Sequence, residues 1–117
     1  MMKSILISRL TEELMSIHPY KIILFGSYAT GGQSINSDID LLVITNSDHF
    51  PVNYKEKSEE YLKVSEVISE IKKQVAVDLI VYTKPMYKKF VELGSMFSKE
   101  IESKGIVLYE DSNQRLA

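Results

Sequence analysis

An apolar run that ends in a glycine and a serine, followed ten residues later by two aspartates, constrains this chain more than any other feature. Ile22–Phe25 leads directly into Gly26 and Ser27, and Asp38 and Asp40 stand at the head of a second apolar run. The first run predicts a strand that stops at a tight turn, where backbone N–H groups and a small hydroxyl can approach phosphate oxygens. Because residues two apart in a strand point to the same face, the two aspartates are expected to lie side by side.

Neighbouring carboxylates repel one another unless a cation lies between them. Oxygen ligands beside a phosphate substrate point to Mg²⁺ or Mn²⁺ at Asp38 and Asp40. A third carboxylate, Asp78, stands within the β-branched run Val75–Tyr82. An ionised carboxylate buried in a strand costs several kcal/mol unless it has a partner. The partner predicted for Asp78 is a metal ion, and the alternative is an ion pair with a lysine such as Lys21.

Size and composition limit the classes of protein to which the chain can belong. A chain of 117 residues with 44% hydrophobic content predicts one compact domain over residues 1–117. A net charge of -2 and two arginines leave no basic stripe for a nucleic-acid backbone, so a DNA template is not expected. The absence of cysteine fits a reducing cytosol, and no apolar run reaches the length of a membrane span. These features predict a soluble cytoplasmic protein.

The pattern of apolar residues and turn signals predicts an α+β fold: a small mixed β-sheet that carries the site on one face, with helices packed on the other. The residues between the first two strands, around Gly31 and Gly32, are expected to form a long polar turn. The predicted helices are Ser4–Ile17, Tyr54–Lys73, Met86–Leu93 and Ser95–Ser103, and the predicted strands are Tyr20–Phe25, Ile39–Thr45, Val75–Tyr82 and Ile106–Tyr109.

The glycine-serine turn and the Asp-X-Asp strand together resemble a known signature. The segments Phe25–Ala29 and Ser37–Val43 resemble the core of the DNA polymerase beta-like nucleotidyltransferase superfamily, and more narrowly of its minimal nucleotidyltransferases. The ending, Phe97–Glu110, is also similar to the tail of these small proteins. The chain departs from them at Thr30, where many members carry Arg or Lys. Three downstream lysines are candidates to supply that charge, namely Lys84, Lys88 and Lys89.

The resemblance implies a reaction and a role for each site residue. A nucleoside monophosphate, AMP from ATP, would be transferred to a hydroxyl group with release of pyrophosphate. Asp38 and Asp40 would bridge two Mg²⁺ ions, with Mn²⁺ as a substitute, and Asp78 would hold the ion that binds the acceptor hydroxyl. Gly26 and Ser27 would hold the β- and γ-phosphates of the nucleotide.

The resemblance also implies a partner, because so small a chain has almost nothing beyond the catalytic sheet. Minimal nucleotidyltransferases are commonly paired with a helical HEPN-type ribonuclease toxin, and as antitoxins they adenylylate one of its tyrosines. One alternative is an antitoxin module that binds the toxin or a nucleotide without catalysis. Another is transfer to a small-molecule hydroxyl, for which a homodimer formed through the long helix could build the acceptor pocket.

Overall fold

In residues 2–33 and 37–111, which the computed structural model describes, four strands form one mixed sheet in the order β3-β2-β1-β4. β1 is antiparallel to both β2 and β4, whereas β2 and β3 are parallel. The predicted α+β class with a small mixed sheet is therefore confirmed. The strands are β1 (Lys21–Phe25), β2 (Ile39–Ile44), β3 (Val77–Tyr82) and β4 (Ile106–Glu110).

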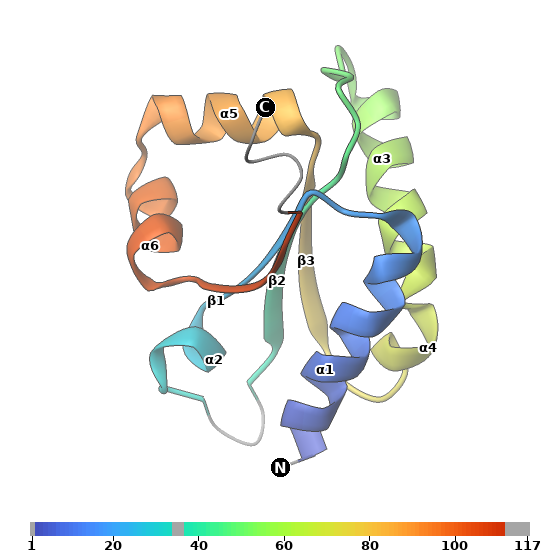
Figure 1. The fold of residues 1–117 in the computed structure, drawn as a ribbon, viewed down its shortest axis with the longest axis vertical. Helices are drawn as coiled ribbons and strands as arrows, with labels where there is room; N and C mark the ends of the chain where they lie inside the picture. The colour runs from blue at the N-terminus through green and yellow to red at the C-terminus, as the bar shows by residue number, and fades with distance from the viewer. Residues whose placement is uncertain (1, 34–36, 112–117) are drawn as a thin grey trace.

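One face of the sheet packs against the N-terminal helix and the connection between the parallel strands. Parallel neighbours require a crossover, which here consists of α3 (Tyr54–Val67) and α4 (Ser69–Lys72). The long predicted helix is thus real but is interrupted at Ile68. With α1 (Met2–Leu14), these helices lie on the same side of the sheet (Figure 1). Their fully or almost fully buried side chains form the main core with alternate strand residues: Leu6, Leu10, Leu14, Val64, Ile68, Ile71, Ile22, Leu24, Leu41 and Val43.

Two further helices lie on the opposite face of the sheet. α5 (Lys84–Leu93) and α6 (Met96–Lys104) stand across the sheet from α1, α3 and α4 in Figure 1. They cover a smaller buried cluster, made of Ile23, Leu42, Ile44 and Ile101. The helical layer expected on one face is therefore joined by a second on the other, because the strand residues that point there are also apolar.

An aromatic cluster joins α5 and α6 to the sheet. The ring of Phe97 on α6 lies 5.5 Å from that of Phe25 and 5.7 Å from that of Phe90, both in edge-to-face geometry. The Phe90 ring in turn lies 5.2 Å from the Tyr82 ring. Such ring contacts add to the stability that the burial of apolar area already gives. They hold α6 over the end of β1, where Gly26 follows.

The ends of α6 are fixed by a capping hydrogen bond and by a close backbone approach. The side chain of Ser95 accepts a hydrogen bond from the N–H of Ser98 at 3.1 Å. At the other end, a Cβ added to Gly105 would lie 2.5 Å from the carbonyl oxygen of Ile101 and 2.8 Å from the side chain of Ile23. Only glycine therefore lets α6 end so close to β1.

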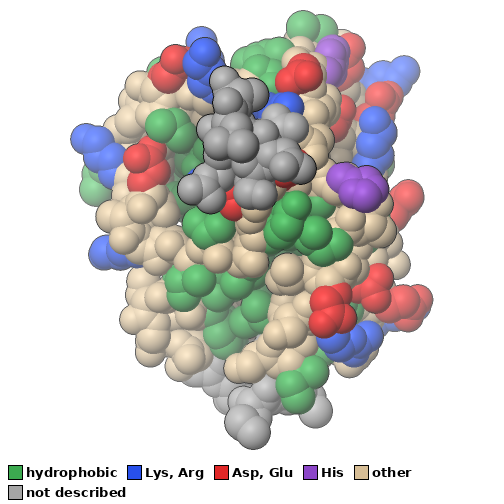
Figure 2. Space-filling view, viewed as in Figure 1, with side chains coloured by type: hydrophobic (Ala, Val, Ile, Leu, Met, Phe, Trp, Pro, Cys, Tyr) green, Lys and Arg blue, Asp and Glu red, His purple; other side chains and the backbone are tan. Residues whose placement is uncertain are grey.

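The surface combines charged side chains with a partly apolar sheet edge. Figure 2 shows apolar side chains gathered towards the middle of one face, with most charged side chains around them. Ile106 and Val107 of the edge strand β4 are exposed. Among the described helices, none has the length and apolar character that a bilayer crossing requires.

Candidate active site

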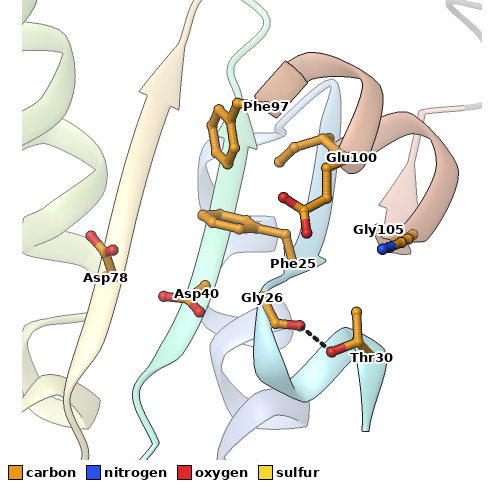
Figure 3. Close-up of a pocket in the computed structure, with 10 residues that line it drawn as sticks. Phe25, Gly26, Thr30, Asp40, Asp78, Phe97, Glu100 and Gly105 are labelled. Carbon is orange, nitrogen blue, oxygen red and sulfur yellow. Dashed lines mark hydrogen bonds between the residues drawn. The ribbon is translucent and has the colours of Figure 1, made fainter. Parts of the chain in front are cut away.

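Two of the predicted aspartates stand directly opposite one another on neighbouring strands. Asp40 of β2 pairs in register with Asp78 of the parallel strand β3. Side chains at paired positions of neighbouring parallel strands point to the same face, and the strands lie about 4.8 Å apart. Asp40 and Asp78 share the face on which α5 and α6 pack, and both line one cavity of about 330 Å³ (Figure 3). The fold thus brings together two carboxylates that are 38 residues apart in the chain.

Asp38 contributes to the same charge cluster from outside the strand. It precedes β2, and its side chain is exposed. Partial burial raises the pKa of Asp40, and the negative charges of Asp78 and Asp38 raise it further. The three predicted carboxylates are therefore close enough for their charges to interact. A bound cation would remove this repulsion.

Oxygen donors and unrelieved negative charge suit a hard divalent cation, so the donor set fits the predicted Mg²⁺ or Mn²⁺. Asp38, Asp40 and Asp78 would be the residues that hold it. Within residues 2–33 and 37–111, no three such side chains already stand in metal-binding geometry. Final coordination would thus require side-chain rotation, which the exposure of Asp38 and Asp78 permits.

The turn after β1 is shaped by Gly26. Its φ is 71°, and a Cβ added there would lie 2.1 Å from the Oδ2 atom of Asp40. Glycine is required both by the backbone conformation and by the close approach of the carboxylate. Ser27 follows at the start of a short helix, α2 (Ser27–Thr30), so part of the expected polar turn is helical. The Oγ1 atom of Thr30 donates a hydrogen bond to the carbonyl oxygen of Gly26 at 3.3 Å and so supports the turn.

Asp78 lies on the strand beside Asp40, as predicted, but in a solvent-exposed position. Its side chain is exposed, so the prediction that burial forces Asp78 to find a partner is wrong. β3 is an edge strand, and solvent reaches its carboxylate at the mouth of the cavity. The alternative partner, Lys21, instead has its Nζ atom 3.9 Å from a carboxylate oxygen of Glu110.

The cavity wall that faces the aspartates is formed by α6 and was not predicted from the sequence. Four residues of α6 line the cavity, at a spacing that places them on one face of a helix: Phe97, Glu100, Ile101 and Lys104. Figure 3 shows Glu100 with its carboxylate pointing into the cavity, between Phe97 and Gly26. The spacing was visible in the sequence, but the face of the sheet that α6 covers was not.

The three candidate lysines for the charge missing at Thr30 do not line this cavity. The Nζ atom of Lys84 lies 3.3 Å from Oδ1 of Asp48, while Lys88 and Lys89 are exposed on α5. Among the described residues that line the cavity, the cation is Lys104, at the end of α6. Thr30 lines the same cavity.

The raised pKa of Asp40 predicts an unusual dependence of stability on pH. Without divalent cations, we expect the unfolding free energy of the wild type, relative to Asp40→Asn, to fall as the pH rises above about 4, the ordinary aspartate pKa. In this window the folded protein binds more protons than the unfolded chain, and stability then declines with pH until the raised pKa is passed. Urea titrations of both proteins over this range would measure the difference. A relative stability that increases with pH would contradict it.

The chain is similar to a known protein family and to several solved structures. A family model described as a nucleotidyltransferase domain matches residues 7–108. No curated protein gives a significant match. Three solved structures have a similar fold, but their sequence identities to this chain are too low to indicate more than the fold. One is a toxin-antitoxin structure with AMP-PNP (TM-score 0.53, 22% identity, covering 92% of this chain and 75% of that chain).

The second is a candidate nucleotidyltransferase from Sulfolobus solfataricus (TM-score 0.56, 20% identity, 90% of this chain and 78% of that chain). The third is a mutant of the toxin-antitoxin MntA-HpeT (TM-score 0.52, 20% identity, 92% of this chain and 75% of that chain). The family model spans all four strands up to Leu108 in β4, and it includes Gly26, Ser27 and the three aspartates. The chain therefore belongs to the nucleotidyltransferase domain family.

Proposed function

We propose that this protein transfers AMP from ATP to a hydroxyl group of a partner protein and acts as the antitoxin of a HEPN-type toxin. The observation that carries the proposal is the placement of Asp40 beside Asp78, on the wall of a cavity that Gly26 also lines. A glycine turn next to paired carboxylates joins a phosphate-binding element to a metal-binding one.

Each residue has a role in the proposed reaction. Gly26 and Ser27 would hold the β- and γ-phosphates, because a tight glycine turn lets backbone N–H groups and a small hydroxyl approach phosphate oxygens closely. Asp38, Asp40 and Asp78 would hold two Mg²⁺ ions, or Mn²⁺ in their place. When bound, such ions neutralise charge on the triphosphate and on the attacking and leaving oxygens.

The proposed transfer is a single displacement at the α-phosphorus. The acceptor oxygen forms a bond to this phosphorus, the bond to the β-phosphate oxygen breaks, and pyrophosphate leaves with that electron pair. Asp78, exposed at the mouth of the cavity, accepts the proton of the acceptor hydroxyl. The exposure of Asp78 leaves room for a hydroxyl presented by another molecule.

The choice of a protein acceptor rests on the exposure of Asp78, which leaves the cavity open to a hydroxyl on another molecule. We propose that residues 1–117 act as one domain, consisting of the catalytic sheet and its helices. Two of the structures that share the fold are described as toxin-antitoxin structures, one of them with AMP-PNP, and this supports a nucleotide substrate and a toxin partner.

Transfer of label from ATP tests the proposal. The protein is incubated with Mg²⁺ and host lysate, once with ATP labelled on the α-phosphate and once with ATP labelled on the γ-phosphate, and the products are separated on a denaturing gel. We expect a labelled protein band from α-labelled ATP alone, because AMP is transferred and the γ-phosphate leaves in pyrophosphate.

Other patterns of label would contradict the proposal in distinct ways. A band from γ-labelled ATP would indicate phosphoryl transfer. Label in small molecules would replace the protein acceptor by a small-molecule hydroxyl. No transfer, combined with retained toxin neutralisation in cells, would favour an antitoxin that binds without catalysis.

A further inference from the structure

α6 presents an acidic and a basic side chain to the candidate active site, one helical turn apart. Glu100 and Lys104 both line the cavity that contains Asp40 and Asp78. Positions four apart on a helix lie on the same face, about 6 Å apart along the axis. Two opposite charges therefore face one cavity from a single rigid element.

Lys104 is suited to bind a phosphate chain. The cavity walls carry the carboxylates of Asp40, Asp78 and Glu100, and among their described residues Lys104 supplies the positive charge. No ion pair joins Lys104 to another residue in the described part of the chain. Gly105, the next residue, lines the same cavity as Gly26 and Thr30 (Figure 3). The end of α6 and the glycine turn therefore border one cavity.

Glu100 is suited to a neutral hydrogen-bond donor rather than to phosphate. Its negative charge would repel a phosphate oxygen, whereas an ionised carboxylate accepts hydrogen bonds from hydroxyl groups through both of its oxygens. It stands on α6, whereas Asp40 and Asp78 stand on the paired strands β2 and β3 across the cavity lining. The hydroxyl groups of a ribose match this requirement, and acidic residues bind ribose in the same way in other nucleotide sites.

We infer that α6 is the nucleotide-recognition helix and that it selects a ribonucleoside triphosphate, with Lys104 on the phosphate chain and Glu100 on the ribose hydroxyls. The inference rests on the proposed function and specifies its substrate class. Phe97 continues the same face of α6 one turn beyond Glu100, away from Lys104. Phosphate, ribose and base would then follow one another along the helix.

Equilibrium binding with Mg²⁺ tests the two roles separately, with ATP, dATP and tripolyphosphate as probes. We expect Lys104→Ala to raise the Kd for both ATP and tripolyphosphate about tenfold, because it removes one charged hydrogen bond. We expect Glu100→Ala not to raise the Kd for tripolyphosphate, because the Glu100 carboxylate makes no favourable contact with phosphate. The wild type should prefer ATP to dATP by roughly tenfold, and Glu100→Ala should abolish most of this preference.

The same helix offers matched controls. Lys99→Ala and Glu102→Ala remove the same charges from exposed positions of α6 outside the cavity, and we expect wild-type binding from both. The double variant Thr30→Arg with Lys104→Ala returns a cation to the cavity wall and should restore tripolyphosphate binding. Far-UV circular dichroism of each variant would verify that α6 remains folded.

The possible outcomes separate this inference from the proposed function. Wild-type affinities for all three probes in Lys104→Ala, or an unchanged preference for ATP in Glu100→Ala, would overturn the inference while the transfer reaction stood. Equal loss of binding in the variants and their matched controls would also overturn it, because the effect would then be on the helix as a whole. A wild-type protein that binds no nucleotide would overturn both proposals.

Discussion

Replacing Asp40 by Asn should lower AMP transfer about a thousandfold or more, because a loss of several kcal/mol of metal-dependent transition-state stabilisation corresponds to such a factor. Asp40 is central to the charge cluster, since it pairs in register with Asp78 and responds to the charge of Asp38. Asparagine keeps the shape of the side chain but removes the negative charge that the cations require. Initial rates of label transfer at saturating ATP would measure the effect.

The same substitution should leave the fold intact. The ionised form of Asp40 is disfavoured by burial and by neighbouring carboxylates, so its neutral replacement should not lower the unfolding free energy at neutral pH. Asp48→Asn is a matched control, because Asp48 is an exposed carboxylate in a loop whose ion pair with Lys84 contributes little.

Neutralisation of a toxin in cells separates catalysis from simple binding. If transfer is the means of neutralisation, Asp40→Asn should fail to protect cells whereas Asp48→Asn should protect them. Full protection by Asp40→Asn together with loss of label transfer would show that binding alone is sufficient. Transfer at the wild-type rate by Asp40→Asn would remove the aspartate cluster from the mechanism.

Replacing Gly26 by Ala should impair both stability and activity. The new Cβ would lie 2.1 Å from Oδ2 of Asp40, and the residue would keep a φ of 71°, which is unfavourable for alanine. Strain and overpacking together should lower the unfolding free energy by roughly 2 to 4 kcal/mol. Displacement of Asp40 or of the turn should also abolish most AMP transfer, even where the protein remains folded. Urea unfolding and the label-transfer assay would measure the two effects.

Gly31→Ala separates backbone strain from the contact with Asp40. Gly31 has a φ of 85°, yet an added Cβ would meet no described atom within 4 Å. We therefore expect a loss of about 1 kcal/mol from strain alone, with transfer near the wild-type rate. If both glycine variants lost stability and activity equally, the close approach of Asp40 to Gly26 would have no special importance.

Much of the secondary structure could be predicted because its signals are local. The helical spacing of Leu6, Leu10 and Leu14 predicted α1, and the apolar run that follows Asp40 predicted β2 with Asp40 near its start. The continuous apolar run Leu41–Ile44 also indicates a strand that is buried on both faces, whereas the prediction placed helices on one face only. A strand that is apolar on both faces is normally covered on both, as this one is by α5 and α6 as well as by the main core.

Other features depend on pairing between distant segments. The predicted role of Asp78 came from resemblance, and its register with Asp40 follows from the crossover that makes β3 parallel to β2. The error about its burial arose because no local pattern distinguishes an edge strand from a central one. The cavity wall of α6 was missed for a related reason, since the face on which α6 packs is set by aromatic contacts such as Phe25 with Phe97.

The sequence by itself therefore determined the family, through Gly26 and Ser27 at a strand end and the spacing to Asp38 and Asp40. These signals are local because backbone freedom at glycine and the two-residue period of a strand act over a few residues. Only the tertiary structure decided which side chains share the cavity. Strand order and helix packing join Asp40, Asp78 and α6 across long stretches of chain, and these contacts depend on the burial of the whole core rather than on any one segment.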